Sequence, residues 1–220
     1  IKKYISNKLP ILNKSKKKLS LICDCANGAL SECIEEILDL LPVKYSIINY
    51  KPNGRNINDN CGSTQISNIC DFVSNLNNNS KIFDLGVSFD GDGDRAIFID
   101  ENCKIYDGDS MVFLLSKHLL KTTEYNKTSV GTLMTNYGIR NLYKNMNINF
   151  IETEVGDKNV FNEIKKHNAM IGGESSGHII INNNNFSIGD GIISLLHVIE
   201  MLITDNKNLS CYGETIKMMP

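Results

Sequence analysis

The chain has 220 residues, 41% of them hydrophobic, which is enough for one large or two small packed domains. Its formal net charge of −2 offers no basic field for nucleic acid or an anionic membrane. There is no apolar run near the roughly 20 residues of a membrane span and no signal-peptide pattern. Because its seven cysteines form no C-x-x-C pair, we expect reduced thiols in a cytoplasmic protein.

In the first half of the chain, apolar runs of strand length alternate with helical patterns. We predict strands at Leu19–Ala26, Tyr45–Tyr50, Leu85–Asp90 and Ala96–Asp100, and helices at Leu30–Leu41 and Thr64–Leu76. The first strand ends at a turn signal, Asn27-Gly28, and Pro42 ends the first helical pattern.

The second half repeats this alternation. We predict strands at Val130–Met134, Phe150–Val155 and Met170–Gly172, and helices at Asp109–Leu120, Gly138–Met146, Lys158–His167 and Gly191–Ile203. Such alternation predicts an α/β fold: two consecutive α/β domains, each a mostly parallel mixed sheet with flanking helices. The pattern restarts near residue 105, so we predict domains at 1–104 and 105–220, each of about 100 residues.

The most informative segment is the carboxylate loop, Asp90–Arg95, which reads DGDGDR between two predicted strands. Its three aspartates, Asp90, Asp92 and Asp94, alternate with glycines that let the backbone fold tightly. Three carboxylates gathered in one place repel one another unless a cation is bound. Oxygen ligands of this kind suit a hard divalent ion, so the loop predicts a metal site.

Two features of this loop allow more than one interpretation. Its D-x-D-x-D pattern with Glu101 superficially matches a calcium-binding EF-hand, but Arg95 stands where that loop needs glycine, and a strand rather than a helix follows. Arg95 itself either pairs with Asp94 or holds a transferring phosphoryl group beside the metal. We favour the phosphate contact.

A second polar loop, Gly172–His178, lies between two apolar strands and reads GGESSGH. Glu174 and Ser176 offer the hydrogen-bonding groups that recognition of vicinal sugar hydroxyls requires. Taken alone, this is weak evidence, because Gly, Glu and Ser are common in ordinary turns.

The two loops in this order resemble the α-D-phosphohexomutase superfamily, in which the first loop binds Mg²⁺ and the second recognises the sugar. Further stretches resemble phosphoglucosamine mutases in particular and cover nearly the whole chain. They are CDCANGA (Cys23–Ala29), PNGRNINDNCGST (Pro52–Thr64), GTLMTN (Gly131–Asn136), VGDK (Val155–Lys158), GESSGH (Gly173–His178) and GDGI (Gly189–Ile192).

The resemblance implies roles for individual residues. It implies that Asp90, Asp92 and Asp94 hold Mg²⁺ and that Arg95 contacts phosphate. It implies that the sugar phosphate is bound by Glu174, Ser176, His178 and Lys158. His178 either contacts the ligand or orients its loop.

The reaction implied is the interconversion of glucosamine 6-phosphate and glucosamine 1-phosphate. An enzyme phosphoserine would donate its phosphoryl group, giving a 1,6-bisphosphate that also serves as activator. Members of the family have four domains, and this chain resembles the second and third, so the serine is expected in a domain that it does not resemble. We therefore expect the isolated chain to be folded but inactive. A homodimer would form through the other domains.

Some positions depart from the family pattern. Ser175 replaces the usual Gln or Asn, Lys158 stands where many members have Arg, and Gln65 where His is frequent. These departures bear on the amino-sugar preference that the resemblance implies and leave the implied type of reaction unchanged. The alternatives are a phosphomannomutase or phosphoglucomutase, and a non-catalytic, metal-dependent sugar-phosphate binding module.

Overall fold

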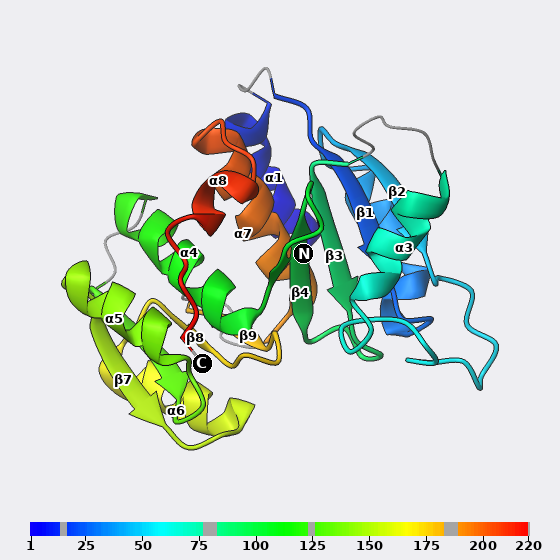
Figure 1. The fold of residues 1–220 in the computed structure, drawn as a ribbon. Coiled ribbons are helices and arrows are strands. Elements are labelled where there is room, and N and C mark those ends of the chain that lie inside the picture. Colours follow the sequence, from blue (N-terminus) through cyan, green and yellow to red (C-terminus); the bar gives the residue numbers. More distant parts are fainter. Residues whose placement is uncertain (14–16, 77–82, 123–125, 183–188, 220) are drawn as a thin grey trace.

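The computed structural model describes residues 1–13, 17–76, 83–122, 126–182 and 189–219 (Figure 1). Within these ranges the chain forms two mixed, mostly parallel sheets with helices packed around them, which confirms the predicted fold class. No helix in the described ranges is long and apolar enough to cross a membrane.

The first sheet has the strand order β2-β1-β3-β4-β5. The strands are β1 (Ser20–Asp24), β2 (Lys44–Ile48), β3 (Leu85–Phe89), β4 (Ala96–Asp100) and β5 (Ile105–Tyr106). Strands β2, β1 and β3 are parallel, whereas β4 and β5 return antiparallel. The carboxyl ends of the three parallel strands therefore share one edge, which is where open α/β sheets place their ligands.

The second sheet has the order β7-β6-β8-β9. It contains β6 (Thr128–Thr132), β7 (Asn149–Thr153), β8 (Ile171–Gly173) and β9 (Ile179–Ile181). The first three strands in this order are parallel, and β9 is antiparallel to β8. The short connection from β8 to β9 is the second polar loop, which thus lies at the carboxyl edge of this sheet.

Nine helices accompany the strands in the described part of the chain. They are α1 (Lys2–Leu12), the 3₁₀ helix η1 (Ala29–Glu32), α2 (Ile34–Leu38), α3 (Ser67–Leu76), α4 (Gly108–Thr122), α5 (Tyr137–Asn145), α6 (Asp157–His167), α7 (Gly191–Thr204) and α8 (Ser210–Gly213). The side chains of Asn136 and Asp190 accept hydrogen bonds from the first backbone N–H groups of α5 and α7, which fixes where these two helices begin.

Helix α1 was not among the predicted elements. It carries Pro10 near its end and buries only Ile5 and Leu12 of its residues, so its pattern is weak. Contacts with α7 hold it in place: the Tyr4 hydroxyl is hydrogen-bonded to a buried imidazole, His197 Nε2, and Lys8 Nζ lies 2.8 Å from Glu200. Tertiary contacts, not local propensity, therefore stabilise this helix.

One apolar core runs through both sheets. Buried residues of β1 and β3 belong to the same cluster as buried residues of α4, β8, β9 and α7. Helix α7 contacts both β4 of the first sheet and β9 of the second, and Figure 1 shows it between the two sheets.

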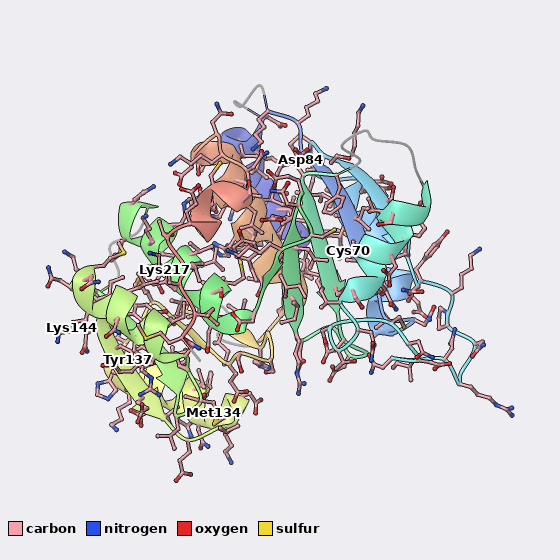
Figure 2. All side chains as sticks on the ribbon, in the orientation of Figure 1. Cys70, Asp84, Met134, Tyr137, Lys144 and Lys217 are labelled. Atoms are coloured by element: carbon pink, nitrogen blue, oxygen red, sulfur yellow. The ribbon has the colours of Figure 1, made fainter. Side chains whose placement is uncertain are left out.

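Figure 2 places Met134 and Tyr137 on the side of the molecule away from the first sheet, where both side chains are exposed.

Candidate functional site

The carboxylate loop connects β3 to β4 at the carboxyl edge of the first sheet. One oxygen from each of Asp90, Asp92 and Asp94 lies within 4.8 Å of the other two, so a single cation between them could be reached by all three. Asp92 is exposed, and Asp90 and Asp94 are half-buried. The alternation of aspartate and glycine thus produces convergent carboxylates, as expected from the sequence.

Hydrogen bonds within the loop set its shape. Asp90 accepts from the backbone N–H of Arg95 through Oδ1 at 3.1 Å, and the N–H of Gly93 donates to the Asp90 carbonyl at 3.2 Å. Gly93 has a φ of +79°, a conformation that side chains rarely adopt. Asp94 Oδ1 is shielded from solvent and has no hydrogen-bond partner among the described residues. A buried carboxylate oxygen without a donor is what a bound cation would satisfy.

Two neighbouring turns enclose this loop. Gly28 lies so close to it that an added Cβ would be 2.2 Å from the carbonyl oxygen of Gly91, and Ala29 N–H donates to that oxygen at 2.8 Å. On the other side, the N–H of Ser63 donates to the carbonyl of Phe89, at the end of β3. The glycine of the first turn is therefore required by a close backbone approach.

A fully buried carboxylate, Asp24, ties these two turns together. It accepts from the backbone N–H of Ala26 in one turn and from that of Gly62 in the other, each at 2.9 Å. Sequence reasoning missed this residue. The available signal was an aspartate at the end of an apolar strand, directly before a turn.

Arg95 lies beside the carboxylates, and its contacts with them leave part of its guanidinium group without a hydrogen-bond partner among the described residues. Its Nε is 3.6 Å from Asp90 Oδ2 and 3.8 Å from Asp94 Oδ1. The contact given for each ion pair is made by Nε, and no hydrogen bond of the terminal guanidinium nitrogens occurs in the described ranges. Its side chain is 45% exposed. Arg95 can therefore pair with the aspartates and still offer two donors to an anion.

The two polar loops meet at His178. Arg95 and His178 form an antiparallel bridge, and the N–H of Ala96 donates to the carbonyl of Gly177 at 3.0 Å. His178 is buried, and its Nδ1 lies 3.4 Å from Asp94 Oδ2. Loops that are far apart in sequence and follow different sheets thus become one site.

Backbone contacts hold the second loop in shape. Glu174 N–H donates to the carbonyl of His178, and one carboxylate oxygen of Glu174 accepts from Gly156 N–H at 2.8 Å. Ser175 and Ser176 are exposed. The Glu174 carboxylate therefore connects this loop to the turn before α6, while Ser176 faces solvent.

The start of α4 supports the same loop. The N–H of Gly108 donates to the carbonyl of Ser175, and an added Cβ on Gly108 would lie 1.8 Å from the carbonyl oxygen of Glu174. The next residue, Asp109, is buried and accepts from Asn136 N–H at 3.0 Å. Burial raises the pKa of the Asp109 carboxyl to about 6, despite that hydrogen bond.

A pocket of about 460 Å³ opens beside the junction of the two loops. Its lining comes from the carboxylate loop, from β9 and the residues next to it, and from the start of α6: Asp94, Asp157, Lys158, Phe161, His178, Ile180 and Gly189. The pocket brings Lys158 and His178 together with a member of the aspartate cluster. Glu174 and Ser176 are not among its lining residues. Asp157 is a lining residue that sequence reasoning did not single out.

Two family models match the chain. Phosphoglucomutase/phosphomannomutase, alpha/beta/alpha domain II, matches residues 2–104, and alpha/beta/alpha domain III of the same family matches residues 107–217. Among curated relatives, a phosphoglucosamine mutase of Ruthia magnifica subsp. Calyptogena magnifica is 40% identical over 203 residues, covering 92% of this chain and 45% of that protein. One of Clostridium kluyveri is 36% identical over 220 residues, covering 100% and 48%. The chain thus spans about half the length of these relatives.

Solved structures share the fold. A phosphoglucomutase/phosphomannomutase family protein from Burkholderia thailandensis superimposes with a TM-score of 0.80 at 18% identity, covering 98% of this chain and 46% of that chain. Aspergillus fumigatus N-acetylphosphoglucosamine mutase, solved in complex with GlcNAc-6P and magnesium, gives a TM-score of 0.76 at 20% identity, covering 99% and 54%.

Proposed function

The chain belongs to the phosphoglucomutase/phosphomannomutase family, and we propose that it forms the two middle domains of a phosphoglucosamine mutase. In this proposal the domains are residues 1–104, with the metal-binding loop, and residues 105–220, with the sugar-binding loop. The substrate assignment is supported by the relatives of that name, which are 36% to 40% identical over most of the chain. The single observation that carries a joint role for the loops is their junction at Arg95 and His178.

The aspartate cluster is proposed to bind Mg²⁺. Three converging carboxylates form a hard oxygen donor set, and the unpartnered Oδ1 of Asp94 fits a bound cation. Asp90, Asp92 and Asp94 would hold the ion, and His178 would orient Asp94 through the contact at Nδ1. When bound, the ion supplies positive charge that stabilises the transferring phosphoryl group.

Arg95 is proposed to hold the phosphoryl oxygens. Its side chain is 45% exposed beside the aspartates, and a planar guanidinium can donate to two oxygens of one phosphate group. Because phosphoryl transfer depends mainly on positioning and on stabilisation of charge, such a contact contributes directly to the rate.

The second loop and the start of α6 are proposed to bind the sugar phosphate. Ser176 and the Glu174 carboxylate oxygen that does not accept from Gly156 would bond sugar hydroxyls. Lys158 would neutralise negative charge from the pocket wall. The ligand must fit in two orientations, since either end receives the phosphoryl group in turn.

The covalent step itself is proposed to use a phosphoserine outside this chain. The free sugar hydroxyl attacks the phosphorus and loses its proton, the bond between phosphorus and the serine oxygen breaks, and the serine oxygen takes up a proton to become a free hydroxyl. The resulting 1,6-bisphosphate reorients and returns the other phosphoryl group to the serine. The same bisphosphate would restore enzyme that has lost its phosphate, which makes it the expected activator.

Phosphorus NMR of the full-length protein, primed with a sugar bisphosphate, tests this function. Glucosamine, glucose and mannose 6-phosphates are compared with Mg²⁺ and with chelator. We expect fastest conversion of glucosamine 6-phosphate, abolished by chelator. Preference for glucose or mannose would move the protein to a sister mutase, and absence of turnover with every sugar would favour a non-catalytic binding module.

A further inference from the structure

The start of α6 presents two opposite charges to the same pocket. Asp157 is the first residue of the helix and Lys158 the second, and both line the pocket next to His178. Both residues are exposed. No hydrogen bond or ion pair of either charged group occurs within the parts of the chain that the structure describes. Asp157 and Lys158 are therefore available to a ligand.

Contacts of the preceding turn fix where these charges lie. Gly156 has a φ of +125°, and its N–H is held by the Glu174 carboxylate at 2.8 Å. The helix that follows buries Val160 and Ile164 against the second sheet. Asp157 thus stands on a rigid element that is attached to the proposed sugar loop.

The charges suit one feature of the proposed substrate. At neutral pH, glucosamine 6-phosphate carries an ammonium group and a phosphate group, whereas glucose 6-phosphate carries only the phosphate. A lysine can serve either ligand. A free carboxylate in the pocket attracts the ammonium group of the first ligand, whereas the second offers it no positive charge to offset repulsion by the phosphate. Specificity arises from such a difference, in which repulsion of the wrong ligand counts as much as attraction of the right one.

We propose that Asp157 determines specificity for the amino sugar by pairing its carboxylate with the ammonium group of the substrate, while the adjacent Lys158 binds the phosphate or a hydroxyl. This rests on the proposed function, because it assigns a role within the same site. It also accounts for amino-sugar preference in a chain whose sugar loop carries Ser175 in place of the usual amide residue.

The test compares the kcat/KM ratio for glucosamine 6-phosphate over glucose 6-phosphate in the full-length protein. Asp157→Asn keeps the size of the side chain and removes its charge. We expect the ratio to fall by about five- to tenfold, the effect of one partly exposed charge pair. Asp157→Glu should retain most of the preference. Glu154→Gln is the matched control, because this exposed residue lies nearby but does not line the pocket.

A pH series provides a second measurement. As the amine of the substrate loses its proton at alkaline pH, the preference of the unmodified protein should decline toward that of Asp157→Asn, whose own ratio should change little. An unchanged ratio in Asp157→Asn, in a protein that still converts glucosamine 6-phosphate selectively, would overturn this proposal and leave the function intact. Loss of all turnover in the unmodified protein would instead overturn the proposed function.

Discussion

At the residue scale, the two loops offer side chains with separable tasks. Asp92 is the exposed member of the aspartate cluster, and its carboxylate makes no hydrogen bond or ion pair among the described residues. Glu174 belongs to the other loop, and its observed contact is with the turn before α6. Substitutions at these two positions should therefore affect different ligands.

We predict a reciprocal pattern for Asp92→Asn and Glu174→Ala in the full-length protein. Asp92→Asn removes one ligand charge at little cost in stability, so Mg²⁺ affinity and turnover should fall strongly. Glu174→Ala should impair sugar binding and turnover while Mg²⁺ affinity stays unchanged. Turnover at limiting Mg²⁺ and calorimetric Mg²⁺ titration provide the measurements. Unchanged turnover of Asp92→Asn at limiting Mg²⁺, or a large loss of metal affinity in Glu174→Ala, would contradict the assignment.

Not every residue that shapes the site carries a motif. The aspartates of the carboxylate loop were predicted because alternation with glycine is a local pattern. Asp24 was not, since its role depends on two backbone N–H groups, one of which belongs to Gly62 on another turn. The proposed role of Asp157 likewise depends on a tertiary feature, the pocket that it lines together with His178.

At the scale of elements, most of the predicted strands and helices lie close to their predicted bounds, and the first predicted helix is the exception. The segment Ala96–Asp100 forms β4 with the predicted bounds. The single helix predicted over Leu30–Leu41 is instead a 3₁₀ turn followed by the short helix α2, which buries Ile34, Ile37 and Leu38. Contacts of Gly28 and Ala29 with the carboxylate loop constrain the start of this segment, so local periodicity alone did not indicate the break.

The beginning of α4 should make stability depend on pH. The folded pKa of Asp109 is about 6, above the ordinary value of 3.8, because burial disfavours its charged form. The folded state therefore binds this proton more tightly than the unfolded state does. The resulting stabilisation is present at pH 4 and is lost as the pH rises through 6.

We predict that Asp109→Asn removes this dependence. Between pH 4 and pH 7, the unfolding free energy of the unmodified chain should fall by about 2 kcal/mol relative to the variant, as expected for a pKa difference of about two units. Urea unfolding followed by circular dichroism at several pH values measures both proteins. A difference in unfolding free energy that stays constant across this range would show that the pKa of the Asp109 carboxyl is not raised.

At the scale of the whole molecule, the two sheets share one large apolar core, and each sheet has a smaller buried cluster of its own besides it. Helix α7 follows the second sheet in sequence, yet it packs against β4 and against α1 at the N-terminal end. Its residues Ile199 and Leu202 are fully buried in the cluster shared by both sheets. The contact between the two loops at Arg95 and His178 depends on this common core.

We predict one cooperative unfolding transition for the 220-residue chain, because opening either sheet exposes apolar surface of the other. In differential scanning calorimetry the calorimetric and van't Hoff enthalpies should agree. Ile199→Ala removes buried atoms from the shared cluster, so it should reduce the free energy of unfolding by about 2–4 kcal/mol and move the single transition to a lower temperature. Two resolved transitions, or destabilisation of only one of them by this substitution, would contradict a shared core.

The sequence by itself determined the α/β class, the order of the strands along the chain and the chemistry of the carboxylate loop, because these depend on periodicity and on neighbouring residues. Only the tertiary structure decided that Arg95 and His178 meet, that Asp157 lines a pocket with His178 and that α1 is a helix. Each of these depends on contacts between residues distant in sequence, and the packing of α7 between the two sheets brings those residues together.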